Sequence, residues 1–320
     1  MRITALTNNR SRARRRGVAA CVAAALLSAG PIACARSRAE SAGARGQGVI
    51  RIIGSDTMVN LLQGWAEQYR RVRPAVVVQV AGGGSGVGFA GLIDRTADIA
   101  AASREIRGAE RERLSAMHGS PPAELTVALD ALAIYVHRGN PIERISIPDL
   151  AEIYGERGTV ARWSQLGARH AGCAGDTIVR IGRQNNSGTY AYFRQIVLGP
   201  GREYRLGSID QSGSKDVVAL VSRMPCAIGY SGLAYATPAV GVVKVAAERA
   251  GAAVAPSTTT VLDGSYPLAR PLYLYTATPA APHVREFLDW VLGPGGQAVV
   301  GDLGFVSPPR LLSAAVLRGR

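Results

Sequence analysis

The chain has 320 residues, of which 47% are hydrophobic and 19% charged, so it holds enough apolar material for two folded domains and is not a disordered or fibrous protein. Its formal net charge of +14 is raised by six arginines within the first 16 residues, and the rest of the chain carries +8. That excess is modest and no basic stripe interleaved with aromatics accompanies it, which argues against a nucleic-acid-binding protein.

The first 35 residues are predicted to be a signal peptide. An arginine-rich start leads into an apolar run over 18–27 and then into small residues around Cys34. Two endings stay open, namely cleavage after Ala35 and a lipoprotein signal with lipidation of Cys34. No later run reaches the roughly 20 apolar residues that a membrane span needs. We therefore expect an exported protein, periplasmic or at the cell surface, with a linker over 36–48.

Two strand–turn–helix units open the folded part of the chain. The apolar run 49–53 predicts a buried strand, and the helix after it begins near Met58 and ends before Pro74. A second strand is expected over 76–80, and a glycine-rich turn over 82–88 leads to a short helix over 89–93. The polar residues of the two turns are Ser55, Asp56, Thr57 and Ser85. A short strand over 98–104 then ends in Ser103 and Arg104.

The rest of the chain repeats the same unit between two long strands. The runs 125–136 and 266–275 are strand-like, and we interpret them as crossings between two lobes. A strand is expected over 178–181. Arg183 follows it, and a helix then begins near Ser187, Gly188 and Thr189. The other expected elements are helices starting at 147, 215 and 284 and a strand over 227–230. Alternating strands and helices predict α/β lobes with largely parallel sheets, which bind ligands at the carboxyl ends of their strands.

The Ser/Gly/Thr turns and the two arginines indicate an oxyanion site. Backbone N–H groups at a helix start are unpaired, and a guanidinium offers a fork of donors that suits a tetrahedral anion. An N-cap accounts for any one such turn, but independent caps would not repeat this composition. No P-loop ending, metal-ligand pattern or Gly-x-Ser-x-Gly elbow is present, and the four histidines lie away from the turns. We expect neither an enzyme nor a cofactor or metal.

Two cysteines follow the signal peptide. Because an exported protein meets oxidising conditions, we predict a disulfide between Cys173 and Cys226, with two buried free thiols as the alternative.

From about residue 49 to 305 the chain resembles the periplasmic substrate-binding proteins of phosphate ABC transporters. The resemblance rests on Gly54-Ser55-Asp56-Thr57, Gly83-Gly84-Ser85-Gly86, the 98–104 segment, Arg183-x-x-x-Ser187-Gly188-Thr189 and Ile228-Gly229-Tyr230-Ser231-Gly232. It implies a two-lobed periplasmic-binding-protein fold of type II, with a hinge between the lobes and the ligand in the cleft. Lobe 1 would comprise 49–132 and 270–320, and lobe 2 would comprise 133–269.

The resemblance also implies a function. The protein would be a monomer that binds inorganic phosphate and delivers it to an ABC permease in the inner membrane. The residues that would contact phosphate are Ser55, Asp56, Thr57, Ser85, Ser103, Arg104, Arg183, Ser187, Gly188 and Thr189.

Two positions depart from the pattern of some family members. Those family members have aspartate where this chain has Arg104, and an acid where this chain has Asn185. Our hypothesis is that Asp56 accepts the phosphate proton instead. Two alternatives remain open, a protein for another oxyanion such as sulfate or molybdate and a secreted phosphoryl-transfer enzyme.

Overall fold

The computed structural model describes residues 48–309. The predicted signal peptide, its Cys34 and residues 36–47 of the predicted linker lie outside the described residues, as does the segment 310–320. Within 48–309, no helix has the length and apolar character that crossing a bilayer requires.

The strands form a sheet system in which parallel strands lie on both sides of a central antiparallel pair. The path of neighbouring strands is β2-β1-β3-β11-β4-β8-β6-β7, and β9 joins β4, β5 and β10 at a branch. The strands are β1 (Gly48–Gly54), β2 (Val76–Ala81), β3 (Ile99–Ala102), β4 (Ala123–His137), β5 (Arg144–Ser146), β6 (Val179–Arg183), β7 (Ile209–Gln211), β8 (Ala227–Gly232), β9 (Val240–Ala246), β10 (Ala253–Val254) and β11 (Ala269–Thr276).

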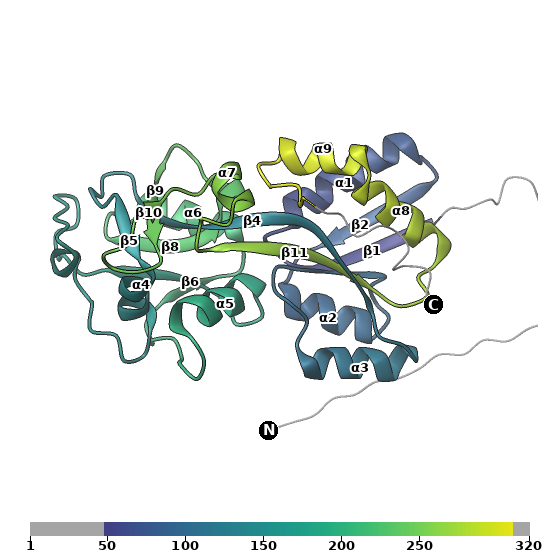
Figure 1. The fold of residues 1–320 in the computed structure, drawn as a ribbon, viewed down its shortest axis with the longest axis horizontal. Coiled ribbons are helices and arrows are strands. Elements are labelled where there is room, and N and C mark those ends of the chain that lie inside the picture. The colour runs from purple at the N-terminus through teal and green to yellow at the C-terminus, as the bar shows by residue number, and fades with distance from the viewer. Residues whose placement is uncertain (1–47, 310–320) are drawn as a thin grey trace, which may run out of the picture. The chain divides into compact units, whose positions relative to one another are not determined.

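The long strands β4 and β11 connect the two lobes of the fold (Figure 1). The first part of β4 pairs antiparallel with β11, and its last residues pair with β8 and β9 of lobe 2. On the lobe 1 side, β11 pairs with β3, which lies next to β1. The sequence predicted both crossings, and it predicted the parallel order of β1 with β2 and of β6 with β8 only in general terms.

Helices cover both faces of each sheet (Figure 1). In lobe 1, α1, α8 and α9 lie on one face and α2 and α3 on the other; in lobe 2, α6 lies opposite α4 and α5. The helices are α1 (Val59–Val72), α2 (Ser85–Ile93), α3 (Gly108–His118), α4 (Ile147–Tyr154), α5 (Gly188–Phe193), α6 (Ser214–Arg223), α7 (Thr258–Leu262), α8 (Pro282–Leu292) and α9 (Pro294–Asp302), with short turns η1 (Trp163–Leu166), η2 (Arg194–Leu198) and η3 (Leu233–Tyr235).

The apolar stripe of α1 shows why this helix packs where it does. Leu61, Leu62, Trp65 and Tyr69 recur at three- and four-residue steps and are all buried. The indole of Trp65 donates to the carbonyl of Gly296 in α9 over 2.8 Å, which satisfies its buried N–H. The predicted core face of this helix is therefore confirmed.

Two elements of lobe 1 differ from the prediction in ways that bear on the site. Helix α2 begins at Ser85, four residues before the predicted start, because the glycines of the turn are compatible with a helical first turn. Helix α3 was not predicted from the sequence, because its buried face includes only Leu114 and it therefore lacks an apolar stripe.

A disulfide joins Cys173 and Cys226, whose Cα atoms are 5.0 Å apart. The bond closes a loop with a sequence separation of 53 residues, which restricts the unfolded chain. We expect the Cys173→Ser/Cys226→Ser variant to lose about 4 kcal/mol of unfolding free energy. Urea denaturation of variant and parent, with the parent also measured under reducing conditions, tests this. Equal unfolding free energies would show that the cross-link does not stabilise the fold.

Candidate functional site

Five buried hydroxyl residues from four separate segments of the chain meet between the two lobes and form a hydroxyl cluster. Its members are Ser55, Thr57, Ser85, Ser103 and Thr189, each no more than 1% exposed. The hydroxyl of Ser55 donates to that of Ser103 over 2.9 Å, and the backbone N–H of Ser103 donates to Ser85 Oγ over 3.1 Å. The Thr57 and Thr189 hydroxyls lie 2.9 Å apart and join lobe 1 to lobe 2. Parallel strands β1 and β3 place the first of these turns side by side, as the fold class predicts.

Gly188 brings the first turn of α5 against this cluster. A Cβ atom at this position would clash with the hydroxyl oxygens of both Ser85 and Ser103. Ser187 precedes it and caps the helix, since its Oγ accepts from the backbone N–H of Thr189 over 3.1 Å. Ser187 thus has the N-cap role that the sequence left open, beside its predicted contact with the ligand.

The cluster offers donors rather than acceptors. Within residues 48–309, the backbone N–H groups of Thr57, Ser85 and Gly188 have no hydrogen-bond acceptor. The hydroxyl hydrogens of Ser85 and Ser103 likewise have none in this part of the chain. Buried donors without partners are costly, so such an arrangement favours a ligand that carries several acceptor oxygens.

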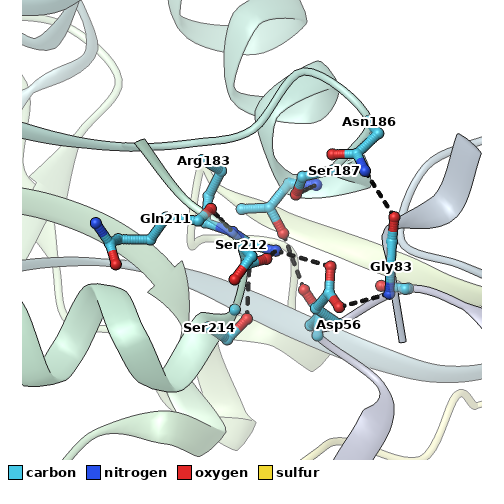
Figure 2. A network of polar contacts seen from close by, with 12 residues as sticks. Asp56, Gly83, Arg183, Asn186, Ser187, Gln211, Ser212 and Ser214 are labelled. Atoms are coloured by element: carbon cyan, nitrogen blue, oxygen red, sulfur yellow. Dashed lines mark hydrogen bonds and ion pairs between the residues drawn. The ribbon is translucent and has the colours of Figure 1, made fainter. Parts of the chain in front are cut away.

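Arg183 and Asp56 form an ion pair beside the cluster (Figure 2). The guanidinium is fully buried; its Nη2 donates to Asp56 Oδ2 over 3.2 Å and to the carbonyl of Ser212 over 2.7 Å. Its Nη1 donates to Ser214 Oγ and its Nε to the carbonyl of Gln211, so one Nη1 N–H has no acceptor among the described residues. Burial lowers the pKa of Arg183, and the charge of Asp56 opposes that shift. Gly83 N–H donates to the other carboxylate oxygen of Asp56 over 2.9 Å.

Arg104 is engaged with an acid of lobe 1. Its guanidinium makes a bidentate pair with Glu110 in α3, at 2.8 and 2.6 Å, and stacks over the ring of Phe89. Burial of Glu110 opposes its ionisation, but hydrogen bonds from Arg104 and Arg107 prevail and lower its pKa. Together with Ser103 and Arg270, Arg104 lines a cleft of about 660 Å³. Its predicted contact with the anion stays a prediction.

Two charged residues at the cluster were missed in the sequence. Arg270 in β11 is 1% exposed and Asp130 in β4 is 2% exposed, and their side chains form an ion pair of 2.8 Å. Burial raises the pKa of Asp130, and Arg270 acts against this shift. A single charged residue inside an otherwise apolar strand was the available signal, because such a residue is costly to bury without a partner.

Asn186 forms two hydrogen bonds with lobe 1 next to the site. Its side-chain amide donates to the carbonyl of Gly83 over 2.7 Å (Figure 2). Its backbone carbonyl accepts from Gly86 N–H over 3.2 Å. Gly84 has a φ of 92°, and a Cβ there would lie 2.5 Å from the carbonyl oxygen of Asn186, so glycine permits this approach. The lobes are thus in direct contact around the hydroxyl cluster.

Comparison with known proteins places this geometry in a family. A model described as the PBP superfamily domain matches residues 39–294. The phosphate-binding protein PstS of Pseudomonas aeruginosa is 34% identical over 281 residues, which cover 85% of this chain and 86% of that protein. Protein SphX of Synechococcus elongatus is 32% identical over 278 residues, covering 83% and 80% of the two chains.

Solved structures agree with the fold. A Clostridium perfringens protein described as a phosphate ABC transporter substrate-binding protein, with bound phosphate, matches with a TM-score of 0.72 and 25% identity, over 81% of this chain and 99% of that one. The two-lobed fold and the resemblance expected from the sequence are confirmed.

Proposed function

The chain belongs to the phosphate-binding proteins of the PBP superfamily, and from this premise we propose that it binds inorganic phosphate and delivers it to an ABC permease. The hydroxyl cluster carries the proposal. It presents several unpaired donors from both lobes, and an anion with four oxygen atoms accepts such donors in all directions.

The charges around the cluster favour an anion held by hydrogen bonds rather than by net charge. Each of the three buried arginines has its own acid, in the pairs Arg183 with Asp56, Arg104 with Glu110 and Arg270 with Asp130. The five hydroxyl residues are also buried, each no more than 1% exposed. A small, dehydrated oxyanion fits both observations.

We propose that the protein acts as a carrier without catalytic activity, since its family consists of binding proteins. It would be an exported monomer, periplasmic or at the cell surface. Its lobes would be 49–132 with 270–320 and 133–269, limits that fall within β4 and at the start of β11. Small-angle scattering should show that phosphate reduces the radius of gyration; an unchanged radius would contradict hinge closure.

Isothermal titration of the mature protein tests the function directly. The protein is stripped of phosphate by partial unfolding, refolded, and titrated with phosphate, sulfate and molybdate in turn. We expect one phosphate per chain and no heat from sulfate. Tight binding of sulfate or molybdate would be consistent with the same fold but would identify a different substrate. Binding of no anion, together with release of phosphate from a phosphate ester, would support the phosphoryl-transfer alternative.

The Asp56→Asn variant tests the proton-acceptor hypothesis. A carboxylate oxygen accepts the proton of phosphate but repels sulfate, which has no proton to offer at neutral pH. We expect the ratio of phosphate to sulfate affinity to fall about 10-fold or more, which corresponds to about 1.4 kcal/mol. Titration with phosphate, in the absence and presence of competing sulfate, measures the ratio.

A matched control separates this effect from the loss of an ion pair. Asp98→Asn also removes the acid of an Arg–Asp pair in lobe 1, because Asp98 pairs with Arg51 at the surface over 3.2 Å. This variant should keep the parent ratio. An unchanged ratio in Asp56→Asn as well would remove Asp56 from the acceptor role.

A further inference from the structure

The ion pair of Arg270 and Asp130 lies on the two strands that connect the lobes. These residues are direct partners in the antiparallel register of β11 and β4. Asp130 Oδ2 accepts from Arg270 Nε over 3.0 Å and from Nη2 over 2.8 Å, so the carboxylate holds the guanidinium in one orientation. The ion pair therefore lies on β4 and β11, the two strands that form the hinge between the lobes.

From this place the guanidinium reaches both lobes. Its Nη2 donates to Thr57 Oγ1 of lobe 1 over 3.2 Å and to Thr189 Oγ1 of lobe 2 over 3.0 Å. Its Nη1 donates to the carbonyl of Ser103 over 3.2 Å. One side chain on the hinge thus touches three members of the hydroxyl cluster.

The direction of these hydrogen bonds constrains the threonines. A hydroxyl has one hydrogen and two lone pairs, so a donor aimed at its oxygen occupies acceptor capacity. Arg270 Nη2 has two N–H groups, and one of them is engaged with Asp130 Oδ2. The other points between the two threonine oxygens, which share it as acceptors, and one threonine donates to the other across 2.9 Å. One hydroxyl hydrogen of the pair then remains, and it is available to an acceptor oxygen of a ligand.

We propose that Arg270, held by Asp130, is a positioning residue that fixes the Thr57 and Thr189 hydroxyls as a donor pair for the bound oxyanion. The inference rests on the proposed function, because it concerns the same anion site. Arg270 acts through the threonines, because Nη2, the nitrogen that reaches them, and Nε are engaged with protein acceptors, and Asp130 balances its charge. Its Nη1 donates to the carbonyl of Ser103, and the second Nη1 N–H has no acceptor among the described residues. Because Thr189 belongs to lobe 2, this donor pair is complete only when the lobes are together.

A double-mutant cycle on phosphate affinity tests the proposal. Arg270→Gln/Asp130→Asn removes both charges at once, so that neither is left buried alone. We expect this variant to bind phosphate about 10- to 100-fold more weakly, and Thr57→Val to lose a similar factor. The variant that combines these substitutions should lose phosphate affinity by a factor about 10-fold smaller than the product of the two separate factors, because either change alone already removes the oriented threonine pair. Losses that multiply would overturn the proposal, as would an unchanged affinity of Arg270→Gln/Asp130→Asn.

Two further variants separate positioning from a general effect on the fold. Arg111→Gln/Glu124→Gln removes another ion pair that involves β4, at 43% and 35% side-chain exposure and without contact to the threonines, and should keep the parent affinity. An equal loss in this control would overturn the proposal. If Arg270→Gln/Asp130→Asn does not fold, Arg270→Lys keeps the charge but lacks the planar fork that Asp130 holds in place while Nη2 reaches both threonines. We expect Arg270→Lys to fold and to lose phosphate affinity, and full affinity would overturn the proposal. Parent protein that binds no phosphate would refute the proposed function instead.

Discussion

Arg183→Ala should reduce phosphate affinity about 100- to 1,000-fold, or about 3–4 kcal/mol, the largest loss from removing any arginine of the site. The guanidinium is fully buried and its one unengaged N–H lies on Nη1, so the substitution removes a charge-assisted hydrogen bond in a dry environment. It also leaves the carboxylate of Asp56 without its counter-ion beside the anion. Both consequences weaken binding.

Titration calorimetry of Arg183→Ala, Arg183→Lys and Arg180→Ala distinguishes charge from geometry. Lysine retains the charge but not the planar fork, so Arg183→Lys should fall between alanine and the parent. Arg180 lies on the same strand, and its Nη2 donates to the carbonyl of Leu206 instead, so Arg180→Ala should bind phosphate normally. Near-normal affinity in Arg183→Ala would remove this residue from the centre of the site.

Much of the site could be predicted because local sequence places it. The turns after β1 and β6 and the turn between β2 and α2 follow strands, and neighbouring parallel strands bring such turns together. The periodicity of each strand and helix is enough to locate Ser55, Ser85 and Thr189 at these turns. Repetition of one composition then indicated a shared ligand.

The parts that could not be predicted depend on contacts between distant segments. Arg270 and Asp130 are 140 residues apart and meet only through the register of β11 and β4, which a single sequence does not specify. Arg104 turns toward Glu110, and the helix that carries this acid has almost no apolar periodicity. The hydrogen bond from the Asn186 side chain to the carbonyl of Gly83 depends on how the lobes meet, which no local pattern encodes.

Gly188→Ala should weaken phosphate binding about 100-fold by hindering lobe closure. A Cβ at this position would overlap the Ser85 and Ser103 hydroxyls of lobe 1, both of which are fully buried and cannot move aside freely. An overpacked contact of this kind costs about 1–3 kcal/mol. Apparent affinity falls with the fraction of molecules that reach the closed state, so the cost appears in phosphate binding. Gly188→Ala changes no charge and removes no side-chain donor.

The matched control for this variant is Gly108→Ala, which also replaces the first residue of a helix. A Cβ at Gly108 would have no atom within 4 Å, so this variant should match the parent in affinity. Scattering with saturating phosphate adds a second measurement, in which Gly188→Ala should stay more expanded than the parent. Parent-like affinity and compaction in Gly188→Ala would mean that the two lobes do not need this close contact, and that the anion lies away from the start of α5.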